Sequence, residues 1–254
     1  MRSNFLVFSD THITPAKYNT LVLEEIRKAI IKGRPDYIIC TGDLGEFASQ
    51  NRLVKDRGSY SLAEELTAVV AHFRHYIVDT VKMIQQEQRK NKKKMYRPLI
   101  VCCMGNHEAA IQDQLMPLLD SIGIVCVPHK MHITIDGIVF CHTFDDGVSG
   151  KPCTNTEQIL RQTMSRTVSG HSHVRSITED RDVHGYKVFA IKLPCANMSY
   201  PDWTPQGSIK WDRGFLWLTA EEHSDWFQYV FREVEDEAWG KSSACSSASK
   251  TAIQ

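Results

Sequence analysis

The sequence lacks several features that mark specialised classes of protein. Lysine and arginine together number 30, as do aspartate and glutamate, so the chain has no net formal charge. A strongly basic nucleic-acid binder or a polybasic membrane protein would carry a large positive net charge. No apolar run approaches the roughly 20 residues that span a bilayer, and the first residues lack the apolar core of a signal peptide. These absences predict a soluble, cytoplasmic protein that makes no use of a membrane.

The Cys-x-x-Cys spacing that is typical of zinc sites is also missing. The eight cysteines contain no Cys-x-x-Cys pair, and several of them (Cys40, Cys102, Cys126 and Cys141) lie in apolar, strand-like runs. A zinc knuckle is therefore not expected. Buried, reduced thiols in a reducing compartment explain this pattern better than disulfides do.

What the chain does contain, in its first half, is an alternation of apolar strands and helices. Its 254 residues are within the range of a single α/β domain. Apolar runs predict strands at 4–10, 36–43, 98–106 and 124–128, and helical spacing predicts helices at 18–32 and 111–123. Strands that alternate with helices indicate βαβ units around a parallel sheet.

After residue 127 the pattern changes to antiparallel pairs. Two alternating runs at 132–142 are joined by Asp136-Gly137, a strong hairpin signal, and further hairpins are expected at 176–194 and 214–234. A parallel half and an antiparallel half predict two facing sheets or one mixed sheet. We expect one domain over 1–238 and a disordered, Ser/Ala-rich tail over 239–254.

One segment, at about 49–97, exceeds what the βαβ plan needs. The sequence predicts a long helix over 61–94 whose apolar positions form a heptad seam: Leu62, Leu66, Val69, Phe73, Tyr76, Thr80 and Met83. A basic run, QRKNKKKMYR, follows at 88–97. Packing of the helix on its own domain and formation of a homodimer through it are both open. Binding of a polyanion by the basic run is a third option.

Polar side chains of metal-binding type gather where the predicted strands end. They are Asp10 and His12 in DTH, Asp43 in GDLGE, Asn106 and His107 in GNHE, His142 after the first hairpin, and His171 and His173 in GHSH. Ligand sites in open α/β sheets lie beyond the carboxyl ends of strands. On an extended strand, the last two histidines would share one face.

The residue types in this set indicate the chemistry of a metal centre. Carboxylate, carboxamide and imidazole groups together suit Mn, Fe, Zn, Co or Ni better than Mg or Ca, which prefer oxygen ligands alone. Seven ligands exceed the needs of one ion. Two ions that share a bridging carboxylate would use them all.

In order and spacing, the motifs DTH, GDLGE, GNHE, a solitary histidine and GHSH resemble the calcineurin-like metallophosphoesterase superfamily. The resemblance implies an α/β fold of four layers, with two mixed β-sheets flanked by helices and a long helical insertion at about 49–97. It also implies two divalent metal ions. We expect Mn²⁺ first, with Fe, Zn, Ni or Co as alternatives.

The resemblance further assigns a role to each residue of the motifs. Asp10, His12 and His173 would hold the first metal, while Asn106, His142 and His171 would hold the second and Asp43 would bridge both. His107 would be catalytic, lying over the substrate phosphate and assisting the leaving oxygen. Glu46 and Glu108 would orient ligands or loops.

The fold and the metals do not decide the substrate. Protein Ser/Thr phosphatases of this superfamily carry Asp-Arg-Gly within the second motif, whereas here Asp56-Arg57-Gly58 begins thirteen residues after Asp43. We therefore expect a phosphodiesterase that cleaves a nucleotide, DNA or RNA phosphodiester by attack of a metal-bridging hydroxide. The alternatives are a phosphomonoesterase or protein phosphatase, and a catalytically silent interaction scaffold.

Overall fold

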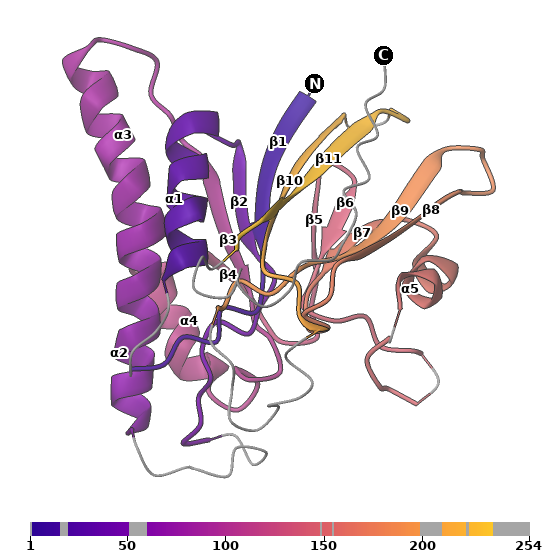
Figure 1. The fold of residues 1–254 in the computed structure, drawn as a ribbon, viewed down its shortest axis with the longest axis horizontal. Helices are drawn as coiled ribbons and strands as arrows, with labels where there is room; N and C mark the ends of the chain where they lie inside the picture. The colour runs from indigo at the N-terminus through magenta and orange to yellow at the C-terminus, as the bar shows by residue number, and fades with distance from the viewer. Residues whose placement is uncertain are drawn as a thin grey trace.

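Two β-sheets face each other, and helices cover both outer faces (Figure 1). The computed structural model describes residues 2–15, 20–50, 60–147, 149–153, 155–198, 210–221 and 224–235. One sheet has the strand order β11-β10-β1-β2-β3-β4 and the other β5-β6-β7-β9-β8. Each sheet contains parallel and antiparallel pairs. The predicted four-layer α/β fold with two mixed sheets is therefore confirmed.

The six-stranded sheet contains the parallel strands that the sequence predicts. These are β1 (Arg2–Phe8), β2 (Tyr37–Cys40), β3 (Leu99–Cys103) and β4 (Val125–Val127). The last hairpin, β10 (Gly214–Glu221) and β11 (Phe227–Glu233), adds to β1 in antiparallel orientation. The two halves of the chain are thus not confined to separate sheets, because its last hairpin completes the first sheet.

The five-stranded sheet is built from the two other predicted hairpins and one further strand. β5 (Ile133–Ile135) and β6 (Ile138–Phe140) turn at Asp136 and Gly137, which both have positive φ. β8 (Ser176–Arg181) and β9 (Lys187–Lys192) form the other hairpin. β7 (Arg166–Ser169) lies between β6 and β9, parallel to both. The helix α5 (Thr156–Thr163), which the sequence did not reveal, packs against β8 and β9.

Apolar side chains fill the space between the sheets and the space under the helices. Along β1, Phe5 and Val7 belong to the core between the sheets, whereas Leu6 and Phe8 belong to the core under the helices. All four are at most 1% exposed. This burial on both faces explains why the strand is a continuous apolar run. The helices α1 (Leu21–Gly33) and α4 (Gln112–Asp120) contribute to the second core.

The long helix differs from the prediction in its register. α2 (Leu62–Phe73) and α3 (Asp79–Lys90) are joined by a π-helical turn, Arg74–Val78. A π-turn holds one residue more than an α-helical turn, so positions one residue later become buried. From the turn onward, Ile77, Val81 and Ile84 are at most 6% exposed, and the predicted seam residues Tyr76 and Thr80 are buried beside them. Met83, a predicted seam residue, is 42% exposed.

The other residues of the predicted seam, including Leu66, Val69 and Phe73, pack against the rest of the same chain. These residues belong to the core under the helices, and α3 and the π-turn contact α1. The helix begins at a capping box of Ser61 and Glu64 and ends at Lys90, before the predicted end at 94. Dimerisation through this helix stays a prediction, which would have to use its exposed face.

The basic run lies at the amino ends of the parallel strands. The Tyr96 hydroxyl donates to the Pro35 carbonyl at 2.8 Å, and the Leu99 amide donates to the Asp36 carbonyl at 3.0 Å. Tyr37 and Leu99 are the first residues of β2 and β3. The length of β3, about 16 Å at 3.3 Å per residue, separates this run from the strand ends that carry the predicted ligands.

Two further features concern thiols and membranes. All cysteines up to Cys195 are free, and all but Cys126 are buried, as the sequence predicts. Across the described ranges, every helix is too short or too polar to cross a membrane. The start of the predicted first helix, Asp56-Arg57-Gly58 and the tail over 239–254 lie outside the described residues.

Candidate metal centre

The loops that follow β1 and β2 lie side by side at the carboxyl ends of the strands. The amide of Asp10 donates to the Gly42 carbonyl at 2.9 Å, and the amide of His12 donates to the Asp43 carbonyl at 3.0 Å. These backbone bonds bring the first two motifs together. In addition, the amide of Gly170 donates to the His142 carbonyl at 3.1 Å, which joins the last two motifs.

The first group of side chains contains Asp10, His12, Asp43 and His173. One ligand-type atom from each lies within 4.8 Å of the others. His173 Nε2 is 3.1 Å from Asp10 Oδ1 and 3.1 Å from His12 Nε2. All four residues are buried. Two imidazoles and two carboxylates therefore converge on one enclosed point.

The second group contains Asp43, His142 and His171, whose ligand-type atoms also lie within 4.8 Å of one another. His142 Nε2 is 3.1 Å from Asp43 Oδ2 and 3.0 Å from Asn106 Oδ1. Asn106 is exposed, so this group opens to solvent. The structure thus brings all seven predicted ligands together, and Asp43 belongs to both groups.

Left-handed backbone conformations are concentrated in this cluster. Five of its residues have positive φ: Asp10, His12, Asp43, His171 and His173. Such conformations are uncommon for residues other than glycine and gather at functional sites. The expectation that the GHSH histidines lie on an extended strand is wrong, because β7 ends at Ser169 and both histidines lie in the bend that follows. Their left-handed backbone, not strand alternation, aims them at the cluster.

Neighbouring groups determine which ring nitrogen of each histidine faces the cluster. His12 Nδ1 is 3.1 Å from Glu46 Oε2, and His142 Nδ1 donates to the Thr41 carbonyl at 3.0 Å. In the neutral imidazoles, each Nε2 then carries a lone pair that points at other acceptors. Lone pairs of nitrogen and oxygen that converge in a buried space fit a cation. The residues present therefore suit divalent metal ions.

Glu108 holds the loops that carry Asp43 and Asn106. Its carboxylate accepts four backbone N–H groups, those of Asp43, Leu44, Gly45 and Gly105, at 2.7 to 3.3 Å. A Cβ at Gly105 would collide with the carboxylate and the amide nitrogen of Asp43. The predicted orienting roles of Glu46 and Glu108 thus agree with the geometry.

The electrostatics of the cluster keep both aspartates ionised. Burial acts to raise the pKa of Asp10, but the nearby His173 outweighs burial and lowers the pKa to about 2. The pKa of Asp43 is likewise well below its usual range, because the charges of His142 and His107 outweigh burial. Burial lowers the pKa of His142, but Asp43 outweighs it and raises the pKa to about 9. Burial, followed by the charge of His142, lowers the pKa of His171 to about 4.

His107 lies at the edge of the cluster. Its Nδ1 donates to the Glu46 carbonyl at 2.9 Å, and its Nε2 is 4.0 Å from Asp43 Oδ2. Burial acts to lower the pKa of His107, but the charges of Asp43 and Glu46 outweigh it and raise the pKa. A third group of ligand-type atoms joins His107 to His12 and the Glu46 carboxylate. This group shares His12 with the first one.

One aromatic neighbour of the cluster escaped the sequence analysis. The ring of Trp211 is 4.0 Å from that of His173, centroid to centroid and nearly perpendicular, and the Arg213 guanidinium lies 5.1 Å from the Trp211 ring centroid. The amide of Asp212 also donates to the His173 carbonyl at 3.0 Å. No sequence motif marks this segment. It lies next to GHSH only because the chain returns to the first sheet at β10.

Comparison with known proteins gives one family and several solved structures. A sequence model of the calcineurin-like phosphoesterase family matches residues 3–189, which include all seven cluster residues and His107. No sequence among curated proteins matches the chain.

Several solved structures are similar to this chain at low sequence identity. Vps29 from Entamoeba histolytica, solved as a single mutant, is 12% identical, with 91% of this chain and 99% of that chain covered and a TM-score of 0.44. Vacuolar protein sorting 29 from Cryptosporidium parvum is 14% identical, with coverage of 92% and 99% and a TM-score of 0.42. YfcE from E. coli, described as a phosphoesterase, is 11% identical, with coverage of 89% and 98% and a TM-score of 0.43.

Proposed function

The chain belongs to the calcineurin-like phosphoesterase family, and from this premise we propose that it is a dinuclear metal-dependent phosphodiesterase acting on a nucleotide or nucleic-acid phosphodiester. One observation carries the proposal: two groups of ligand-type side chains share the single carboxylate of Asp43. A structural site for one ion would need about four ligands. A scaffold would have no physical need for seven.

Each ion would be held by residues from different loops. Asp10, His12 and His173 would bind one cation, Asn106, His142 and His171 the other, and Asp43 both. The mixture of imidazole, carboxylate and amide donors supports Mn²⁺, with Fe, Zn, Ni or Co as alternatives. When bound, two such cations supply Lewis acidity to the phosphoryl group and make water acidic enough to react near neutral pH.

We assign His107 the role of general acid. The bond from Nδ1 to the Glu46 carbonyl fixes the ring and leaves Nε2 toward the cluster. In the metal-free chain, burial is outweighed by the charges of Asp43 and Glu46, which raise the pKa of His107 and so favour the doubly protonated imidazole. In an in-line displacement, the acid gives its proton to the leaving oxygen on the side opposite the attack. The position of His107 at the edge of the cluster supports this role.

The charge of the substrate bears on the choice between a diester and a monoester. Within the described ranges, the ion pairs of Asp10 and Asp43 are all with histidines, none with lysine or arginine. A phosphate monoester carries nearly two negative charges at neutral pH, since its second pKa is about 6, whereas a diester carries one. The diester therefore needs less positive charge beyond the metals.

The placement of the basic run favours a small nucleotide substrate over a long nucleic acid. Lys92, Lys93 and Lys94 are exposed at the amino ends of the strands, away from the cluster. A polyanion bound there would not lie directly over the cluster. We therefore place nuclease activity second to hydrolysis of a nucleotide-sized diester.

Metal loading and substrate choice test the proposal together. The purified chain would be stripped with a chelator, reloaded with Mn²⁺ and assayed on bis-p-nitrophenyl phosphate, cyclic nucleotides, single-stranded DNA and p-nitrophenyl phosphate. We expect about two ions per chain and Mn²⁺-dependent cleavage of the diesters. Activity on the monoester alone would contradict a diesterase. Two bound ions without cleavage of any ester would favour the scaffold alternative.

A further inference from the structure

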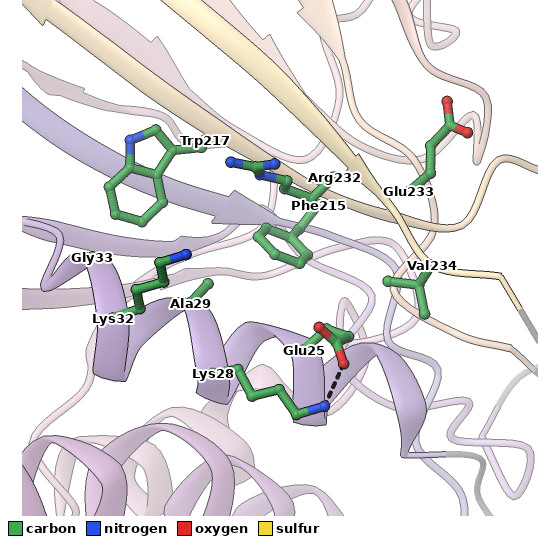
Figure 2. A pocket seen from close by; sticks show the side chains of 10 residues that line it. All are labelled: Glu25, Lys28, Ala29, Lys32, Gly33, Phe215, Trp217, Arg232, Glu233 and Val234. Carbon is green, nitrogen blue, oxygen red and sulfur yellow. Dashed lines mark hydrogen bonds and ion pairs between the residues drawn. The ribbon is translucent and has the colours of Figure 1, made fainter. Parts of the chain in front are cut away.

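A groove of about 430 Å³ lies between α1 and the strands β10 and β11 (Figure 2). Its apolar part is formed by Ala29, Phe215 and Trp217, and cationic side chains from the helix and from β11 extend beside it. It shares no residue with the candidate metal centre. The phosphoesterase site therefore gives no account of this groove.

The indole of Trp217 is fixed in place by close packing against α1. A Cβ at Gly33 would collide with the Trp217 ring, so only glycine permits this contact. The sequence predicts that this helix ends at residue 32, before Gly33. In the structure Gly33 is the last helical residue, and Arg34 takes the left-handed cap conformation with φ of 47°. The absence of a side chain at Gly33 thus allows the Trp217 ring, which borders the groove, to pack against the helix.

Two cations in the groove have no acidic partner among the described residues. The two acidic residues that line the groove are already paired, Glu25 with Lys28 at 2.6 Å and Glu233 with Arg175. Lys32 and Arg232 extend toward the space over Trp217 and Phe215 (Figure 2). In the part of the chain that the structure describes, neither forms an ion pair. An anion between them would relieve the repulsion of two like charges.

We propose that this groove is a docking site for an acidic peptide segment of a partner protein, with one large apolar side chain seated against Trp217 and Phe215. Charge complementarity with Lys32 and Arg232 would orient the segment and set the rate of encounter. Aromatic residues and arginine are enriched among side chains that contribute most to protein interfaces.

The form of the groove favours a peptide over a small molecule. It is open to solvent along α1, whereas small-ligand sites enclose about 70–90% of their ligand. Its cations are exposed side chains without buried partners, as is typical of an interface rim. A groove that is open on one side can still bury most of one apolar side chain of a bound peptide.

Fluorescence anisotropy with labelled synthetic peptides tests the docking site on the full chain. The probe is EDEFED, and the comparison peptides are EDEAED, without the aromatic ring, and KRKFKR, with reversed charge. We expect EDEFED to bind in the micromolar range, EDEAED about tenfold more weakly, and KRKFKR not measurably. Absence of EDEFED binding, or equal binding of all three peptides, would overturn the proposal.

Protein variants locate the binding. The double variant Lys32→Glu with Arg232→Glu should weaken binding of EDEFED by about tenfold or more. The matched control, Lys92→Glu with Lys93→Glu, makes the same change in net charge at the amino ends of the strands and should alter binding less than about twofold. Equal losses in both variants would mean general charge attraction and would overturn a defined site. Displacement of the peptide by ADP at the same Kd as ADP alone would reassign the groove to a nucleotide.

The apolar half of the site has its own variant. Trp217→Ala should weaken EDEFED binding by about tenfold while Mn²⁺ content stays unchanged. Because this change also removes packing, its melting temperature would be measured beside that of the double charge variant, whose replaced side chains are exposed. Normal binding by a folded Trp217→Ala chain would exclude the aromatic contact.

Discussion

The two ends of the parallel strands carry charge in opposite ways. At the carboxyl ends, Asp10 and Asp43 are 0% and 1% exposed and converge with histidines. At the amino ends, Lys92, Lys93 and Lys94 are exposed and lie in the segment after α3. Buried charges need a partner, because leaving water is costly, whereas exposed charges are solvated and need none. The carboxyl ends therefore specify a chemistry that the basic run does not.

Among the variants that test this difference between the two ends, a change at Asp43 should have the largest effect on activity. Asp43→Ala removes the carboxylate that belongs to both groups. We expect kcat/KM to fall by about 10³-fold or more and the metal content to drop from two ions per chain. Metal analysis and diester hydrolysis measure these changes. Unchanged metal content would contradict the bridging role, and Asp145→Asn is the control, since Asp145 stands outside the three ligand-type groups.

Replacement of His107 separates proton transfer from metal binding. His107→Asn should lower kcat by about 10²–10⁴-fold on diesters with a poor leaving group, the usual contribution of a general acid, while metal content remains unchanged. Esters of p-nitrophenol should suffer much less, because that leaving group needs little help from an acid. An equal loss on both substrates would point to a role in binding and not in protonation.

A change at Glu108 tests whether the carboxyl ends depend on their buried partners for stability. Glu108→Ala leaves four backbone N–H groups without their acceptor. We expect the free energy of unfolding to fall by about 2–4 kcal/mol, since each unsatisfied buried group costs about 1–3 kcal/mol and water can enter in part. Urea denaturation measures this loss. Glu157→Ala, at an exposed position of α5, should change stability by less than about 0.5 kcal/mol, and an equally small effect at Glu108 would contradict the holding role.

The stability of the metal-free chain should depend on pH in a way that reflects the raised pKa of His142. Its pKa is raised from 6.5 to about 9, so the charged imidazole stabilises the folded state below pH 6.5, and this contribution is lost as pH rises toward 9. The loss is at most about 3 to 4 kcal/mol, at about 1.4 kcal/mol per pKa unit. The pKa values of His12 and His171 are lowered from 6.5, so these residues act in the opposite direction, but their contribution is nearly complete about one pH unit above 6.5.

Thermal melts at pH 6.5 and pH 9, after the metal is removed with a chelator, measure how the stability of the chain changes with pH. With Mn²⁺ present, the slope should reverse, because imidazole must be neutral to bind a metal. His142→Asn should make this slope shallower in the metal-free chain, while His107, whose pKa is also raised, contributes part of what remains. A melting temperature of the metal-free chain that rises between pH 6.5 and 9 would contradict the raised pKa.

The smallest effect is expected at the amino ends. Reversal of Lys92, Lys93 and Lys94 to glutamate should change stability by less than about 0.5 kcal/mol and should leave kcat/KM on bis-p-nitrophenyl phosphate within about twofold at physiological salt, where charges are screened beyond roughly 8 Å. A tenfold loss on single-stranded DNA alone would show that the run guides a polyanion. That outcome would return nuclease activity to first place.

Local patterns predicted the parts of the fold that local physics decides. The runs of β1, β2 and β3 are apolar because both faces are buried over most of their length, and Asp136-Gly137 turns because both residues have positive φ. The π-turn at Arg74–Val78 could not be predicted, because nothing in the heptad spacing marks the added residue. Trp211 could not be predicted either, because its contact with His173 joins two loops that are far apart in the sequence.

The sequence by itself determined the residue types of the cluster and their place at strand ends, because parallel strands present their carboxyl ends at one edge of the sheet. Only the tertiary structure decided how these residues meet. The left-handed backbone at His171 and His173, the double membership of Asp43 and the four bonds to Glu108 arise from loops packed against one another. Such contacts depend on the relative positions of distant segments, which no local pattern encodes.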